Sequence, residues 1–106
     1  MGMFDFWKRA DINAGVEQCQ SQSGGVLLDV RTREEYAQGH IPGSCHLDVQ
    51  RIQQAPNLWP DKSVPLFVYC RSGARSGQAV FQLKKMGYGN AVNIGGILDY
   101  RGALER

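Results

Sequence analysis

Two short apolar runs dominate the hydrophobic pattern of the chain. One covers residues 26–30 and the other residues 65–69, and each is nearly continuous rather than alternating. Continuous runs of this length are typical of strands that are buried on both faces, as in a parallel sheet. Pro65 stands at the first position of its run, where the sheet loses no backbone donor. Weaker runs at residues 44–47 and 91–94 are interpreted as two further short strands.

Helix signals lie between these runs. Asn13 is expected to cap a helix that runs to about Gln22 and is ended by Ser23, Gly24 and Gly25. Thr32 and Glu35 fit a capping box, which opens a short helix ending at Gly39. Apolar residues recur at helical spacing further along the chain. The other expected helices cover residues 49–55, 76–86 and 97–104, with a Pro-rich turn after the first of them.

The alternation of strands and helices predicts an α/β fold with a mostly parallel sheet and helices on both faces. A chain of 106 residues has the size of one domain, and it contains no internal repeat or long linker. The start of the chain fits this order least well. We interpret residues 1–11 as an N-terminal arm, with a strand expected near Ile12, and residues 12–106 as the domain.

Composition and charge narrow the range of partners. Hydrophobic residues make up 42% and charged residues 21% of the chain, and the net charge is +2. This balance argues against a nucleic-acid or membrane-surface partner. No apolar run approaches the roughly 20 residues that cross a bilayer, and the start lacks the pattern of a secretory signal. A cytoplasmic location is therefore expected.

The cysteines and histidines give no sign of a metal site. Cys19, Cys45 and Cys70 form no C-x-x-C spacing, and an odd number leaves at least one thiol unpaired. His40 and His46 are too few and too scattered for a zinc site. We expect three free thiols in a reducing compartment, no metal and no cofactor.

The candidate chemistry lies in the six residues from Cys70 to Arg75. They follow a buried strand and precede the helix expected from Ser76, where free backbone N–H groups and the helix dipole favour an anion. Arg71 and Arg75 add positive charge, and Gly73 allows the backbone to curl tightly. Such surroundings stabilise a nucleophilic thiolate. An inert core cysteine is the alternative, but it would not explain the arginines and the glycine.

This loop resembles the C-x-x-G-x-R active-site loop of rhodanese-like sulfurtransferases. Residues 29–31, 35–36 and 39–44 are similar to the upstream signature of that family, and residues 93–97 are similar to its closing strand and turn. The resemblance covers about residues 12–104. Among single-domain members, Tyr69-Cys70 and residues 76–79 are similar to the phage-shock type. That type is exported, whereas no export signal is recognised here.

The resemblance implies five parallel strands flanked by helices and a Cys70 persulfide as the carrier of sulfur. Cys70 would take sulfur from a small anionic donor such as thiosulfate and pass it to a small thiol or a protein. Arg71 is expected to recruit the donor. Arg75 is expected to brace the loop through Asp29, for which a solvated turn residue is the alternative, and Arg31 is a further supporting residue. The backbone N–H groups expected to hold the terminal sulfur of the persulfide belong to Arg71, Ser72, Gly73, Ala74 and Arg75.

Two other functions are weighed against sulfur transfer. Phosphatases and arsenate reductases related to this fold carry five residues between the cysteine and the arginine, whereas four separate Cys70 from Arg75. The shorter loop favours a single sulfur atom over a tetrahedral phosphate. The other alternative is a persulfide carrier or regulatory module without significant thiosulfate turnover. Inert modules of this family commonly lack the cysteine, which is present here.

Overall fold

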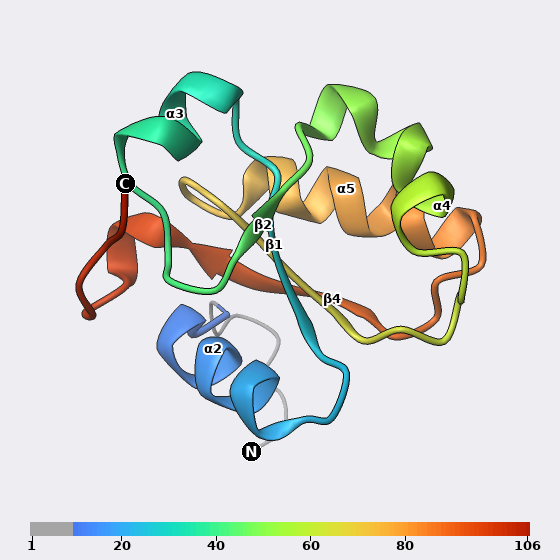
Figure 1. Ribbon diagram of the computed structural model, residues 1–106, viewed down its shortest axis with the longest axis horizontal. Helices are drawn as coiled ribbons and strands as arrows, with labels where there is room; N and C mark the ends of the chain where they lie inside the picture. The colour runs from blue at the N-terminus through green and yellow to red at the C-terminus, as the bar shows by residue number, and fades with distance from the viewer. Residues whose placement is uncertain (1–9) are drawn as a thin grey trace, which may run out of the picture.

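The core of the fold is a sheet of four parallel strands in the order β2-β1-β3-β4 (Figure 1). The computed structural model describes residues 10–106. The strands are β1 Val26–Asp29, β2 Cys45–His46, β3 Leu66–Cys70 and β4 Ala91–Gly96. The helices and 3-10 turns are α2 Ile12–Ser21, α3 Arg33–Gln38, η1 Val49–Gln54, α4 Ala55–Leu58, α5 Ala74–Lys85 and η2 Ile97–Asp99.

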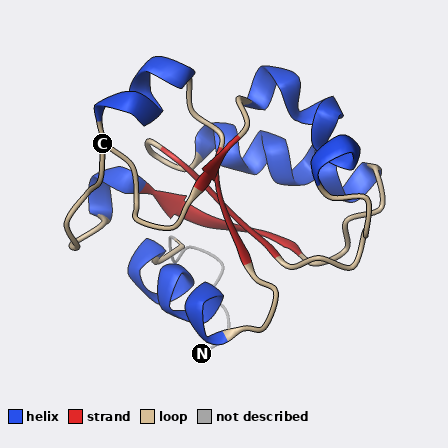
Figure 2. Cartoon of the chain, viewed as in Figure 1, coloured by secondary structure: helices blue, strands red, loops and turns tan. Residues whose placement is uncertain are grey.

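Helices cover both faces of the sheet, as the burial of the central strands requires. All five residues of β3 are buried, and successive side chains point to opposite faces. Leu28, Val68 and Cys70 pack in the cluster under α5, whereas Leu27 and Tyr69 pack in the cluster against α2. Figure 2 shows α2 on one side of the strands and α3, η1, α4 and α5 on the other, while η2 packs near α2. The predicted α/β class is confirmed.

The register of β1 and β3 brings their two following loops together. Asp29 at the end of β1 is paired with Tyr69, the residue before Cys70 in β3. Because parallel strands end at the same edge of a sheet, the loops after them lie side by side. This edge holds the candidate site.

The expected five strands are not found, since residues 10–106 contain four. The strand expected near Ile12 is wrong: Ile12 is fully buried in the first turn of α2. Asp11, rather than Asn13, caps this helix and accepts a hydrogen bond from the Asn13 N–H at 3.0 Å. The Asn13 side chain instead bonds the Asp99 carbonyl and the Arg101 N–H, at 2.9 Å each. Asn13 therefore ties α2 to the C-terminal segment.

Most of the expected arm lies outside the described residues, which begin at residue 10. The division of the chain into an arm over residues 1–11 and a domain over residues 12–106 stays a prediction.

The C-terminal segment is extended where a helix was expected. Only η2 forms within residues 97–104, and Tyr100 already has an extended backbone with φ −75° and ψ 130°. The tail pairs instead with His40, two residues after α3: His40 and Glu105 exchange two backbone hydrogen bonds of 2.8 Å. Figure 1 shows the C-terminus beside the end of α3. These two bonds pair the backbone groups of Glu105 with those of His40.

The segment between η1 and β3 also departs from expectation. The predicted Pro-rich turn contains α4, with Pro56 in its first turn. Proline fits there because the first helical residues have no intrahelical partner for their N–H groups.

Candidate active site

The loop after β3 turns directly into α5 at the sheet edge. Cys70 is the last residue of β3 and is only 1% exposed. Gly73 takes the left-handed conformation, with φ 105°, and precedes the helix without any side-chain cap. The helix begins at Ala74, two residues earlier than expected, so Arg75 lies in its first turn. The first N–H groups of α5 therefore remain available to a group inside the loop.

The Cys70 sulfur occupies that position. The Gly73 N–H donates to Sγ at 3.0 Å, and the Ser76 hydroxyl lies 3.3 Å from Sγ. Burial raises the pKa of the Cys70 thiol, but hydrogen bonds from the Ser76 hydroxyl and from the N–H groups of Ser76, Gly73 and Ser72 outweigh it, so the pKa is lowered. The loop therefore stabilises a thiolate. The Ser72 and Gly73 N–H groups, which the resemblance assigns to the outer sulfur of a persulfide, contact Sγ itself here, and the Ser76 hydroxyl, which was not predicted, joins them.

The end of β4 and the residues after it pack directly against the Cys70 loop. Cys70 is in register with Gly96, and the Leu98 N–H donates to the Arg71 carbonyl at 3.2 Å. A Cβ at Gly96 would overlap the Arg71 carbonyl oxygen and stand 2.6 Å from the Ser72 Cα. Only glycine therefore lets β4 approach this closely. The sequence alone indicates only a turn at Gly96.

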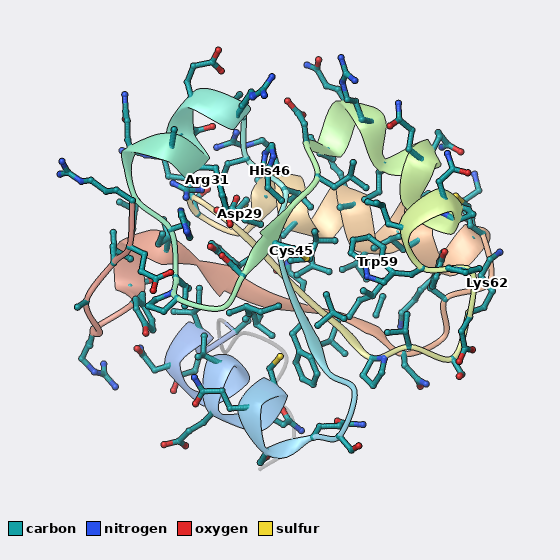
Figure 3. The ribbon with its side chains drawn as sticks, in the orientation of Figure 1. Asp29, Arg31, Cys45, His46, Trp59 and Lys62 are labelled. Carbon is teal, nitrogen blue, oxygen red and sulfur yellow. The ribbon has the colours of Figure 1, made fainter. Side chains whose placement is uncertain are left out.

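Arg75 braces the loop through Glu35, so the expected pairing with Asp29 is wrong. The guanidinium donates Nη1 to Oε1 of Glu35 at 2.7 Å and Nη2 to Oε2 at 3.0 Å. Asp29 is fully buried and is held by Arg31 through three side-chain contacts of 2.7 to 3.0 Å (Figure 3). Because Arg31 engages both carboxylate oxygens, Asp29 is neither Arg75's partner nor a solvated turn residue.

Glu35 serves two elements at once. Its Oε1 accepts from the Thr32 N–H at 2.9 Å and the Thr32 hydroxyl at 3.0 Å, which completes the predicted capping box of α3. The hydrogen bond from Arg75 is the main cause that lowers the pKa of Glu35 to about 2, and the same bond raises the pKa of Arg75. The parallel pairing of β1 with β3 could have suggested the contact between Glu35 and Arg75, because it places the helix after β1 beside the loop after β3.

The two remaining predicted arginines have different surroundings. Arg31 is 6% exposed and also donates to the Gly39 carbonyl at 2.8 Å, so it fixes the turn after α3. Arg71 is exposed, and its guanidinium forms no ion pair with any other residue between 10 and 106. Its charge is thus available to an anion at the loop.

The other two cysteines lie in less reactive surroundings. Cys19 is buried in α2, and Cys45 is half-buried on the edge strand β2, with its Sγ 3.5 Å from the Leu27 carbonyl. Burial raises the pKa of both thiols. Within residues 10–106, no three histidine, cysteine or acidic side chains gather as metal ligands. No helix in the same range has the length and apolar character of a membrane span.

A parallel α/β sheet whose edge carries a cysteine inside a tight Cys-to-Arg loop defines a rhodanese-type domain. The family model for the rhodanese-like domain matches residues 10–103. The chain belongs to this family of sulfurtransferases, as its loop predicted.

Individual proteins that are similar to this chain are also sulfurtransferases or rhodaneses by name. Thiosulfate sulfurtransferase PspE of Escherichia coli is 37% identical over 73 residues, which cover 68% of this chain and 70% of PspE. Adenylyltransferase and sulfurtransferase uba4 of Ogataea parapolymorpha is 35% identical over 96 residues, 90% of this chain but only 25% of uba4. A solved structure of a rhodanese with anions from E. coli superposes with a TM-score of 0.70 at 33% identity, covering 76% of this chain and 96% of that one.

Proposed function

We propose that this chain transfers sulfane sulfur from a small anionic donor such as thiosulfate to a thiol or protein acceptor, through a persulfide on Cys70. The observation that carries the proposal is the Cys70 sulfur held by N–H and hydroxyl donors in a loop that opens α5. These donors lower the pKa of the Cys70 thiol, which favours the thiolate that attacks the donor.

Loading of the sulfur is a displacement on thiosulfate. The Cys70 thiolate attacks the outer sulfur, a new S–S bond forms to Sγ, and the S–S bond of thiosulfate breaks. Sulfite leaves with the electron pair, and the enzyme carries Cys70–S–S⁻. No oxidant or proton is required. Discharge reverses the roles: the acceptor attacks the outer sulfur and Sγ leaves as thiolate.

The loop supplies charge at both steps. Arg71 is exposed and unpaired among the described residues, so we assign it to the capture of the anionic donor. The remaining N–H groups from Arg71 to Arg75 are assigned to the outer sulfur, as an oxyanion hole holds oxygen. Arg75 is engaged by Glu35 and is assigned to holding the loop in shape.

The comparisons support the donor class. PspE is named a thiosulfate sulfurtransferase, and the E. coli rhodanese structure was solved with anions. The free state of Cys19, Cys45 and Cys70 is consistent with a reducing compartment, and we place the protein in the cytoplasm on that ground. No nucleic-acid or membrane partner is part of the proposal.

The test is the intact mass of the protein after incubation with thiosulfate. We expect a gain of one sulfur atom, which cyanide then removes as thiocyanate. Cys70→Ser should abolish the gain, while Cys19→Ser and Cys45→Ser should retain it. Loading without turnover on cyanide would favour the carrier or regulatory module over the enzyme. A protein that gains no sulfur, or a Cys70→Ser variant that still gains it, would overturn the proposal.

A further inference from the structure

The buried Ser76 hydroxyl lies next to the sulfur of Cys70. It has more hydrogen-bond acceptors within reach than it has protons to donate. Ser76 is fully buried, and its Oγ lies 3.3 Å from Cys70 Sγ, 3.1 Å from the Gly73 carbonyl oxygen and 2.7 Å from Asn93 Oδ1. A hydroxyl has one proton, so it donates to only one of these three acceptors at a time. The shortest of the three contacts is to Asn93.

The Asn93 carboxamide presents its oxygen to Ser76 because two backbone groups fix its orientation. The Gly95 N–H donates to Oδ1 at 3.0 Å, and Nδ2 donates to the Gly73 carbonyl at 3.0 Å. Flipping the amide would set a donor against the Gly95 N–H and an acceptor against the Gly73 carbonyl. Asn93 therefore competes with the cysteine sulfur for the Ser76 proton.

The charge on the sulfur decides this competition. A neutral thiol needs an acceptor, and Ser76 Oγ can accept from it while donating to Asn93. An anionic thiolate needs a donor, and a hydrogen bond to a charged acceptor is the stronger one. We propose that Ser76 donates to Asn93 when Cys70 Sγ is neutral and turns to donate to Sγ when that sulfur is anionic, with Asn93 as the positioning residue.

This switch rests on the proposed function. It predicts which way the Ser76 hydroxyl points at each step of sulfur transfer. In the loaded state the negative charge lies on the outer sulfur and Sγ is neutral, so the hydroxyl points to Asn93. When an acceptor takes the outer sulfur, charge develops on the leaving Sγ and the hydroxyl turns back to it. Ser76 then stabilises the leaving group, whereas Asn93 stabilises the thiol and the persulfide.

The two residues must therefore shift the ionisation of Cys70 in opposite directions. Ser76→Ala removes a donor to the thiolate, and the midpoint pH of Cys70 alkylation should rise, with about tenfold less thiolate below the midpoint. Asn93→Ala removes the acceptor that favours the thiol, while the Gly73 carbonyl remains as a longer-range substitute. The midpoint should fall, with about threefold more thiolate at the same pH.

The experiment measures iodoacetamide alkylation of Cys70 across pH, resolved by peptide. Asn90→Ala is the matched control, because Asn90 also holds a loop carbonyl, that of Ser63 at 2.8 Å, away from the site. In the double variant the midpoint should equal that of Ser76→Ala alone. If Asn93→Ala raises the midpoint, leaves it where Asn90→Ala leaves it, or still lowers it without Ser76, the switch is wrong.

A second variant covers the case in which Asn93→Ala does not fold. Asn93→Asp keeps an acceptor oxygen in place and adds negative charge, so the midpoint should rise more in the presence of Ser76 than in the Ser76→Ala background. Equal rises in both backgrounds would overturn the switch. Alkylation needs no sulfur donor, so these outcomes are separate from the proposed function, which thiosulfate loading tests.

Discussion

Two strand-to-helix junctions lie at the carboxyl end of the sheet, beside the candidate active site. The helices that follow them begin in different ways. After β1, Thr32 and Glu35 form a complete capping box at the start of α3. After β3, Gly73 opens α5 with no side-chain cap. Both junctions follow buried parallel strands that are paired with each other. The backbone topology is shared, and the side chains at the helix start differ.

That difference decides which junction can receive an anion. At the start of α3, the Thr32 N–H donates to the Glu35 carboxylate and the Glu35 N–H donates to the Thr32 hydroxyl, so these N–H groups are not available to an anion. At α5, the corresponding N–H groups face the sulfur of Cys70. A helix N-terminus therefore becomes a reactive site only where its caps are missing. Glu35 links the two junctions, because the residue that closes α3 also holds Arg75.

Apart from the loss of Cys70 itself, the largest effect should come from Gly96→Ala, which pushes β4 against the uncapped junction. The new Cβ would meet the backbone of Arg71 and Ser72, which cannot move aside as a flexible side chain could. We expect sulfur transfer to fall by about a hundredfold as the loop is displaced. Gly89→Ala is the control, because nothing lies within 4 Å of its added Cβ. Steady-state thiocyanate production measures both variants, and equal activities would contradict this account of the loop.

The three cysteines provide the next contrast. The pKa of Cys70 is lowered by the loop's hydrogen bonds, whereas burial raises the pKa of Cys19 and of Cys45. At about pH 6.5, Cys70 should react with iodoacetamide at least about tenfold faster than the other two. Added sulfate should slow this reaction by occupying the N–H groups. Equal rates for the three thiols, with no protection by sulfate, would show that the junction does not bind anions.

The sequence predicts contacts between residues that are close along the chain, but not contacts between residues that are far apart. The capping box of Thr32 and Glu35 is local, since its spacing alone specifies it. The clamp from Glu35 to Arg75 spans 40 residues and follows only from the pairing of β1 with β3. The positions of Asp29 and Arg75 near neighbouring strand ends predict that they pair, yet Arg31, two residues from Asp29, binds the Asp29 carboxylate.

The same reasoning explains the misplaced elements. The C-terminal segment was expected as a helix from its local sequence, but a distant partner, His40, pairs with Glu105 in the structure. The contact between Ser76 and Asn93 also joins residues 17 apart, on α5 and β4. Neither pairing leaves a spacing signal in a single sequence. The central strands, by contrast, were found directly from their continuous apolar runs.

A smaller effect is expected when the link between the junctions is removed. Glu35→Gln loses the charge that holds Arg75 but keeps an oxygen that can cap α3. We expect turnover to fall by about fivefold to tenfold, with a smaller change in the Michaelis constant for thiosulfate. Thr32→Ala is the complement, because it breaks the capping box and leaves the clamp. It should lower the melting temperature with little loss of turnover. If the two variants had the same kinetic defect, the clamp would have no role separate from the cap.

The smallest predicted effect is an acid-dependent loss of stability that belongs to Glu35. Arg75 lowers the pKa of this carboxyl from 4.5 to about 2 in the folded protein. A depressed folded-state pKa stabilises the protein above the unfolded value, and this stability is lost as the pH falls from about 4.5 toward 2. Because the pair is partly exposed, with Glu35's side chain 27% accessible, we expect only about 1 kcal/mol. Urea unfolding of the wild type and Glu35→Gln should therefore differ at pH 6 and converge near pH 2. Glu34→Gln is the control, because Glu34 lies in the same turn of α3 but is exposed and forms no ion pair among the described residues, so it should lose less stability at pH 6 than Glu35→Gln. A Glu35→Gln difference that persisted at pH 2 would assign the loss to packing instead of charge.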